Sequence, residues 1–157
     1  MALEKSKEEK RLRQIPHLIN LNEDPMLSGK LKYFLVDGDT HVGRRFNAPN
    51  SENHIMMGGA DIQPQHCIIS VSSDAQGRKA VCLAAKLGAR VFVNGDQLKD
   101  TETENAASNI EDGDRLVFGN STAFTIRIPE NNRDGSDDGL MPCFCIFLAF
   151  CSRNINR

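Results

Sequence analysis

The segment IEDGDRLVFGNSTAFTIRIP, from Ile110 to Pro129, decides the fold class. It holds two short apolar stretches, DRLVFG and AFTIRI, and a turn rich in Gly, Asn and Ser separates them. In the second stretch Phe124, Ile126 and Ile128 alternate with polar residues, which is the period of a half-buried strand. The segment therefore predicts two β-strands joined by a tight turn.

Four stretches further upstream show the same character, since each is short, rich in β-branched or aromatic residues and bounded by Gly, Asn or Asp. They are KLKYFLV (Lys30 to Val36), HCIISV (His66 to Val71), KAVCLAA (Lys79 to Ala85) and ARVFVNG (Ala89 to Gly95). No long amphipathic pattern interrupts residues 30–128, which argues against parallel βαβ units. We expect an all-β protein, an antiparallel sandwich or barrel.

Composition limits the number of domains and the kinds of partner. The chain has 157 residues, a formal net charge of -2 and no tryptophan. This length suits one domain with tails, and the charge gives no basic footprint for nucleic acid. The five cysteines are an odd number, and charged residues stand where a secretory signal needs an apolar core. We expect a protein of the reducing cytoplasm that binds no nucleic acid.

The two ends of the chain differ from its body. Residues 1–15 are rich in Glu, Lys and Arg, and we expect a helix there, either an exposed frayed helix or the stub of a coiled coil. The body is predicted to span residues 16–129, because Pro16 ends the helix. Residues 130–141 have the composition of a flexible linker.

A Cys- and Phe-rich tail, residues 142–157, closes the chain with the apolar run PCFCIFLAFC. The run is about half as long as a helix that crosses a bilayer, so we expect no direct membrane binding. Its cysteines lack the second ligand pair of a structural zinc site. Three interpretations stay open: an element packed on the domain, a lipidated segment, or the abnormal end of a truncated chain.

Enzyme signatures are missing from the sequence. It contains no phosphate loop, no Gly-x-Ser-x-Gly elbow and no His-x-x-x-His pair. Asp112 and Asp114 flank Gly113, and we interpret them as caps of a turn in which the glycine takes a positive φ, not as a catalytic pair. We expect no enzymatic activity, no cofactor and no metal.

Arg44 is the first candidate site residue. In THVGRR it follows a short strand and Gly43, so its side chain is predicted to project from the loop end of the sandwich. A guanidinium is a planar fork for phosphate oxygens and keeps its charge at every physiological pH. The alternative is a solvated loop residue.

The order of the motifs resembles the forkhead-associated (FHA) domain over about Leu31 to Pro129. The motifs are THVGRR, NHIMMGGADIQPQHCII, ARVFVNGDQL and IEDGDRLVFGNSTAFTIRIP. The preceding segment PHLINLNEDPMLSGKLKYFL resembles the one that introduces this domain in kinesin motors of the third family, the vesicle carriers. The resemblance implies a β-sandwich of about eleven antiparallel strands, with a short N-terminal helix and a flexible C-terminal tail.

The family pattern implies roles for several residues. Gly43 is expected to shape the turn, Arg44 to contact phosphate, and His66 to brace the loops through hydrogen bonds. Asn94 and Gly95 are expected to form a hairpin turn and not to contact a ligand.

Four positions depart from the family pattern. Gln63 stands where the family keeps a phosphate-binding serine, and its amide can still donate a hydrogen bond. Ala89 stands where the family keeps an asparagine for the peptide backbone, with Leu87 and Arg90 in place of the nearby Ser and Gly. The pocket thus loses much of its polar set, while Arg90 is a candidate for a second positive charge.

These observations give two hypotheses for function. The first is a non-catalytic protein interaction module of a kinesin in microtubule-based vesicle transport, which contacts coiled-coil segments, a second copy of the chain as a homodimer, or a cargo adaptor. The second is a reader of phosphothreonine peptides on a phosphoprotein, through Arg44. We expect the protein to be cytoplasmic and cytoskeleton-associated, with ATP and microtubules bound only by a motor domain of the parent protein.

Overall fold

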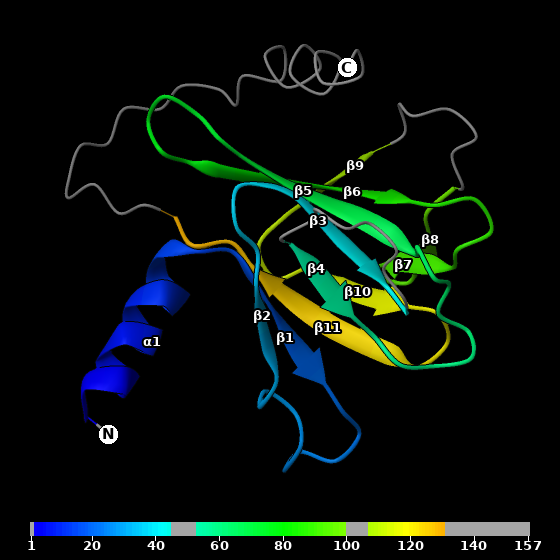
Figure 1. The fold of residues 1–157 in the computed structure, drawn as a ribbon, viewed down its shortest axis with the longest axis horizontal. Coiled ribbons are helices and arrows are strands. Elements are labelled where there is room, and N and C mark those ends of the chain that lie inside the picture. Colours follow the sequence, from blue (N-terminus) through cyan, green and yellow to red (C-terminus); the bar gives the residue numbers. More distant parts are fainter. Residues whose placement is uncertain (1, 45–52, 100–106, 131–157) are drawn as a thin grey trace.

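The computed structural model describes residues 2–44, 53–99 and 107–130 (Figure 1). Within these residues the chain forms one helix and eleven strands, which confirms the predicted all-β fold and its N-terminal helix. The elements are α1 (Ala2–Gln14), β1 (His17–Leu21), β2 (Lys32–Phe34), β3 (Gly38–Gly43), β4 (His54–Met56), β5 (Cys67–Ser73), β6 (Lys79–Ala85), β7 (Val91–Val93), β8 (Asp96–Gln97), β9 (Ser108–Ile110), β10 (Arg115–Phe118) and β11 (Thr122–Arg127).

The strands form two sheets that pack face to face (Figure 1). One sheet has the order β2-β1-β11-β10-β7-β8, and the other has the order β4-β3-β5-β6-β9. The strand pairs are antiparallel with one exception, because β4 runs parallel to β3 and pairs Ile55 with Val42.

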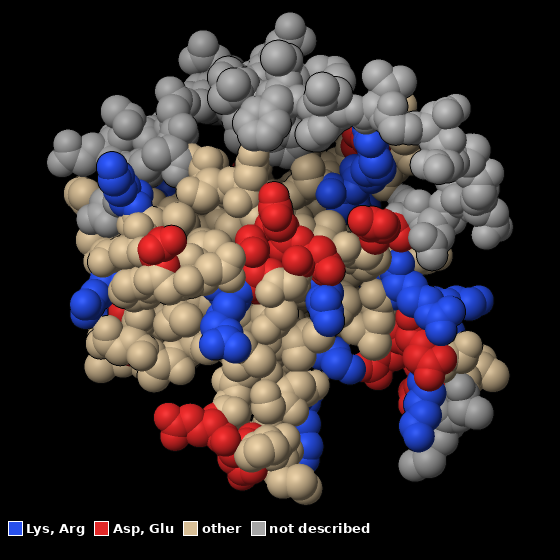
Figure 2. Space-filling model, turned by 180° about the vertical axis from the view of Figure 1, so that it is seen from behind, with Lys and Arg blue, Asp and Glu red and all other residues tan. Residues whose placement is uncertain are grey.

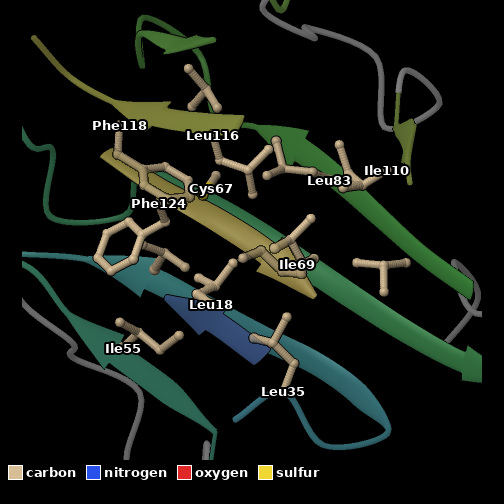
Figure 3. Packing of buried hydrophobic residues seen from close by; sticks show 14 of the residues in the cluster. Leu18, Leu35, Ile55, Cys67, Ile69, Leu83, Ile110, Leu116, Phe118 and Phe124 are labelled. Atoms are coloured by element: carbon tan, nitrogen blue, oxygen red, sulfur yellow. The ribbon is translucent and has the colours of Figure 1, made fainter. Parts of the chain in front are cut away.

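The hydrophobic core lies between the two sheets. Along β5 and β11 buried residues alternate with more exposed ones, so that one face of each of these strands points into the core. Figure 3 shows Leu18, Ile69 and Phe124 pointing into this layer from β1, β5 and β11. The ring centroids of Phe118 and Phe124 lie 6.0 Å apart with tilted planes, a favourable aromatic arrangement.

The six predicted strands are present as β2, β5, β6, β7, β10 and β11, within a few residues of the predicted bounds, and the short strand expected before Arg44 is β3. The sequence did not predict β1, β4, β8 and β9, which have two to five residues each. Such short strands carry too little periodicity to be recognised. They are formed because their neighbours in the sheet supply hydrogen bonds and a buried face.

The N-terminal helix α1 packs against the edge strand β2. Glu8 forms an ion pair with Lys32 at 3.3 Å, and the Arg11 guanidinium lies 4.4 Å from the centroid of the Phe34 ring. These contacts attach a helix that has almost no apolar face of its own. The predicted linker beyond Glu130 and the Cys- and Phe-rich tail lie outside the described residues.

Two turns have the backbone conformation that their sequences predict. Asn94 and Gly95 have φ values of 53° and 96°, as a two-residue hairpin turn of type I′ requires. Gly113 has a φ of 87°, and the flanking carboxylates accept backbone hydrogen bonds, Asp114 from Glu111 and Asp112 from Ile128. The two aspartates therefore hold a turn.

Candidate functional site

Arg44 lies immediately after β3, at the end of the sandwich that also holds the β4–β5 loop. Gly43 has no space for a side chain, because a Cβ there would lie 2.2 Å from the carbonyl oxygen of Pro64. The backbone N–H of Arg44 donates to the Gln63 carbonyl over 2.9 Å. The Arg44 side chain is exposed and makes no hydrogen bond or ion pair with the described part of the chain. Its backbone is fixed, while its guanidinium is open to a ligand.

His66 connects two loops beneath this arginine. Its side chain is fully buried, and its Nδ1 accepts the backbone N–H of Gln63 over 3.1 Å. Since Nδ1 is the acceptor, Nε2 carries the proton and donates to the Arg90 carbonyl over 3.0 Å. The neutral imidazole thus holds the β4–β5 loop against the start of β7.

A tight turn from Lys86 to Ala89 lies next to the Gln63 side chain. Ala89 N–H donates to the Lys86 carbonyl over 2.9 Å, and Gly88 at the third position has a φ of 72°, as type II turns require. The Ala89 side chain is buried at 1% exposure, whereas Leu87 is 62% exposed. The Gln63 amide reaches this turn, because its Nε2 lies 3.1 Å from the position that a Gly88 Cβ would occupy.

Arg90 points toward the β10–β11 turn. Its Nη1 donates to the Asn120 side-chain oxygen over 3.0 Å. The backbone N–H of Asn120 donates to the Asp61 carboxylate, so a single asparagine joins an arginine and an aspartate. The sequence predicts Arg90 as a second positive charge for a ligand; in the structure this charge is engaged with Asn120 and lies in the field of Asp61.

Asp61 sits in a notch made by two glycines. A Cβ at Gly119 would lie 2.3 Å from one carboxylate oxygen of Asp61, and a Cβ at Gly59 would lie 2.9 Å from the other. The pKa of Asp61 is lowered, chiefly by the hydrogen bonds that its carboxylate accepts from the backbone N–H groups of Asn120 and of Asp61 itself, with the Arg90 charge as a smaller cause. The carboxylate is therefore ionised at neutral pH.

The structure brings together four of the predicted site residues, namely Gly43, Arg44, Gln63 and His66, with Arg90 on the neighbouring strand start. Asn94 and Gly95 lie apart, on the β7–β8 turn, where the Asn94 side chain donates to Asp114 over 2.8 Å and accepts from the Arg115 N–H over 2.9 Å. They belong to the scaffold.

The sequence does not predict Asp61 and Asn120 as site residues. Their only signal is a neighbouring glycine in each loop, because Gly59 and Gly119 leave room for the carboxylate between them. The hydrogen bond joins residues 59 positions apart, a pairing that no local pattern reveals.

Neither a metal centre nor a membrane span is found in the described residues. No three side chains of His, Cys, Asp or Glu gather there as metal ligands. The single helix in this part of the chain is too short to cross a bilayer. Cys67 and Cys82 are both buried, and burial raises the pKa of the Cys67 thiol.

The described residues form a sandwich of eleven strands, with an arginine at its loop end and a buried histidine behind it, which is the architecture of an FHA-type module. The chain belongs to the FHA domain family, whose model matches residues 40–119. Among curated proteins it is 36% identical over 121 residues to the kinesin-like protein KIF1A of Rattus norvegicus, covering 77% of this chain and 7% of that protein. It is 37% identical over 117 residues to KIF13A of Homo sapiens, covering 74% of this chain and 6% of that protein.

Solved structures agree with this fold. The MEK1 FHA domain superposes with a TM-score of 0.59 at 13% identity, covering 80% of this chain and 98% of that domain. The same domain in complex with a phosphothreonine peptide of HOP1 gives a TM-score of 0.56 at 16% identity, over 73% of this chain and 97% of that one. The yeast Dun1 FHA domain with a doubly phosphorylated peptide gives 0.56 at 21% identity, over 81% and 85% of the two chains.

Proposed function

We propose that this chain is the FHA interaction module of a kinesin-like motor and that it binds helical segments, those of a second copy of the chain or of a neighbouring coiled coil. The observation that carries the proposal is a hydrogen-bonded hairpin, residues 22–31 between β1 and β2, that exposes three large apolar side chains. The similarity to KIF1A and KIF13A supports the kinesin context. For the parent protein, the proposal includes ATP-driven movement, microtubule-based vesicle transport, binding of cargo adaptors and a cytoplasmic location.

The hairpin is held in one shape by its own hydrogen bonds. Asn20 accepts the Leu31 N–H over 2.9 Å and donates through its amide to the Leu27 carbonyl over 3.1 Å. Asp24 caps the tip, because its carboxylate accepts the Met26 N–H over 2.8 Å and its carbonyl accepts the Ser28 N–H over 3.1 Å. A fixed loop loses little conformational entropy on binding.

The tip of this hairpin exposes apolar surface. Met26, Leu27 and Leu31 are 70%, 51% and 46% exposed. In Figure 2 the hairpin projects at the bottom of the molecule as a mostly uncharged surface, with acidic side chains on one side of it and basic side chains on the other. Exposed apolar groups that are held in place and gathered on one projection indicate a protein contact.

The region next to the hairpin already binds a helix. Through Glu8 and Arg11, α1 contacts Lys32 and Phe34 of β2, which is the strand that leaves the hairpin. The helix carries five basic residues, Lys5, Lys7, Lys10, Arg11 and Arg13, against three glutamates. A basic helix from a second copy complements the acidic pair Glu23 and Asp24 at the tip.

Sedimentation analysis of the whole chain tests this proposal. We expect the parent chain to dimerise and the double variant Met26→Ser, Leu27→Ser to dimerise at least about tenfold more weakly, which corresponds to 1.4 kcal/mol. Met56→Ser is the matched control, because Met56 is 61% exposed on β4, away from the hairpin. A parent chain that stays monomeric, or a double variant that dimerises like the parent, contradicts the proposal.

The second candidate function is the reading of phosphothreonine peptides by Arg44. The observation that favours it is the exposed guanidinium at the end of β3, and related folds have been solved with such peptides. Titration with a phosphothreonine peptide library, compared between the parent and Arg44→Ala, tests it. Binding that is weaker than millimolar, or that the substitution leaves unchanged, rules this function out.

A further inference from the structure

We propose that the outer face of the six-stranded sheet binds an amphipathic helix of another protein, one that carries an acidic residue beside its apolar stripe. This surface includes neither the hairpin tip nor the loop end at Arg44, so the inference goes beyond the function proposed above. The apolar side chains that form the surface are Leu21, Phe92, Val117 and Ala123.

Two strands of this sheet are apolar on both faces. In β10, Leu116 and Phe118 point into the core (Figure 3), so Val117 between them faces outward. In β7, the buried Val91 is followed by Phe92, which lies opposite Val117 and shares its face. Strands that are apolar on both faces are typical of sheets covered on both sides, whereas an antiparallel sheet that meets water usually turns polar side chains outward. The outer face is therefore suited to a partner that covers it.

The apolar side chains form one row across four strands. Ala123 of β11 lies opposite Leu21 of β1 on one side and opposite Val117 of β10 on the other, and Val117 lies opposite Phe92 of β7. Directly opposite residues point to the same face of a sheet. All four side chains are half-buried, and none belongs to the core between the sheets. With strands about 4.8 Å apart, the row is about 14 Å long.

The outer face of the other sheet has a different composition. There β5 turns Ser70 and Ser72 outward, and they lie opposite Cys82 and Ala80 of β6. Ile68 is the one large apolar side chain that these two strands place on that face. The apolar row is thus a property of the six-stranded sheet and not of the whole sandwich.

Arg115 supplies an unpaired charge next to the row. It is exposed at the start of β10, on the same face, and its guanidinium makes no hydrogen bond or ion pair with the described residues. The other Lys and Arg residues in the strands of this sheet are engaged, Lys32 with α1 and Arg127 with Asp112, each over 3.3 Å. The Asp114 carboxylate is used by the turn before β10. A carboxylate of a partner can therefore pair with a guanidinium at the edge of the row.

A helix matches this row, whereas a strand does not. The four strands lie inside the sheet and have a neighbour on each side, so a partner strand finds no free edge there. A helix satisfies its own backbone and offers only side chains. Apolar residues at i, i+4, i+7 and i+11 of a helix span about 16 Å, which is close to the length of the row.

The helix α1 of a second copy does not have the required chemistry. It carries five Lys and Arg residues against three glutamates, and its large apolar residues are two leucines. Arg115 repels such a basic helix. The partner of this surface is therefore a different protein, which keeps the surface distinct from the dimer contact proposed for the hairpin.

Two displayed libraries of a helical peptide test the inference on the whole chain. Both randomise positions i, i+4, i+7 and i+11 among Leu, Ile, Val and Phe, and one library carries Glu beside this stripe where the other carries Lys. We expect the parent chain to enrich binders from the Glu library, and Arg115→Glu to enrich them from the Lys library instead. Arg115 is exposed, so this substitution decides the question even where variants of the sheet fail to fold. Enrichment from neither library, or the same preference in both chains, overturns the inference.

The double variant Phe92→Thr, Val117→Thr tests the apolar row, because threonine keeps the β-branched shape that strands favour. We expect the enriched peptides to bind it at least about tenfold more weakly by fluorescence polarisation. Ile68→Thr is the matched control, since Ile68 is a half-buried apolar residue on the outer face of the other sheet, and it should bind like the parent. Binding that survives the double variant, or that is lost in Met26→Ser, Leu27→Ser instead, overturns the inference.

Discussion

The β1–β2 hairpin and the loop end around Arg44 differ in how their side chains are used. The hairpin uses its polar groups internally, through Asn20 and Asp24, and turns Met26 and Leu27 outward. At the loop end, the Arg44 side chain makes no hydrogen bond with the described residues. Arg90 and Asp61 both bind Asn120 and thereby connect the loops to one another. The two regions are well separated in Figure 1, where the hairpin projects at the bottom and β3 ends at the right.

This difference shows that a fold can be kept while its binding surface changes. The scaffold features of the loop end, Gly43 and His66, are present with their contacts. Ala89 and Gln63 stand where the family pattern implies an asparagine and a serine that face a ligand. The function of the domain therefore depends on the side chains at each of these surfaces and does not follow from the fold alone.

The largest effect is expected from Gly43→Ala, which breaks the loop end alone. The new methyl group would lie 2.2 Å from the backbone oxygen of Pro64, and a backbone atom cannot move aside cheaply. We expect a loss of about 3 kcal/mol in the free energy of unfolding, measured by urea titration. Gly58→Ala is the control, since nothing lies within 4 Å of a Cβ there. Equal stability of the two variants would show that the close approach is unimportant.

His66→Phe is expected to cost about 2 kcal/mol, because it keeps a ring but removes two buried hydrogen bonds. The Gln63 N–H loses its acceptor, and the Arg90 carbonyl keeps only the Gly119 N–H. Urea unfolding measures the loss, and peptide binding at the loop end should fall with it while dimerisation persists. A variant as stable as the parent would show that the hydrogen bonds of His66 do not stabilise the fold.

Thr40→Val is expected to stabilise the scaffold between the two regions by about 1 kcal/mol. The Thr40 hydroxyl is buried in the core and has no hydrogen-bond partner among the described residues. Replacing it by a methyl group removes this desolvation cost at nearly the same volume. Thermal unfolding checks the gain, and neither dimerisation nor peptide binding should change. A destabilised variant would indicate that the hydroxyl has a partner.

The smallest effect is expected in the pH dependence of folding stability, through the carboxyl group of Asp61. Its pKa lies below the ordinary value of 3.8 in the folded state, so the stability it contributes is present above pH 3.8 and is lost as the pH falls through the lower folded value. We expect Asp61→Asn to flatten this part of the acid unfolding curve. Asp74→Asn is a comparison at an exposed turn whose carboxyl pKa is also lowered, by Arg78, away from the loop end. An acid curve that Asp61→Asn leaves unchanged would contradict an ionised Asp61.

Much of the sandwich could be predicted because its longer strands show period-two burial. Phe124 and Ile126 of β11 are the clearest example. The strand β1 was missed because Leu18, Ile19 and Leu21 do not alternate strictly, and it is fixed by pairing with both β11 and β2. A strand in the middle of a sheet gains its order from neighbours that local sequence does not show.

The candidate site could be predicted in part. Arg44, Gln63 and His66 follow a linear motif, so their places could be predicted from the sequence. The position of Arg90 could not, because its guanidinium is directed by Asn120, which lies 30 residues further along the chain. The exposure of Met26 and Leu27 is likewise a property of the folded hairpin, since apolar residues between strands are as often buried.

One sedimentation experiment on three chains compares the two regions at once. The parent, the double variant Met26→Ser, Leu27→Ser and the variant Arg44→Ala are measured at the same concentrations. We predict that the hairpin variant loses dimerisation by at least about tenfold, while Arg44→Ala dimerises like the parent. Dimerisation that depends on Arg44 and survives the loss of both apolar side chains would contradict the assignment of helix binding to the hairpin.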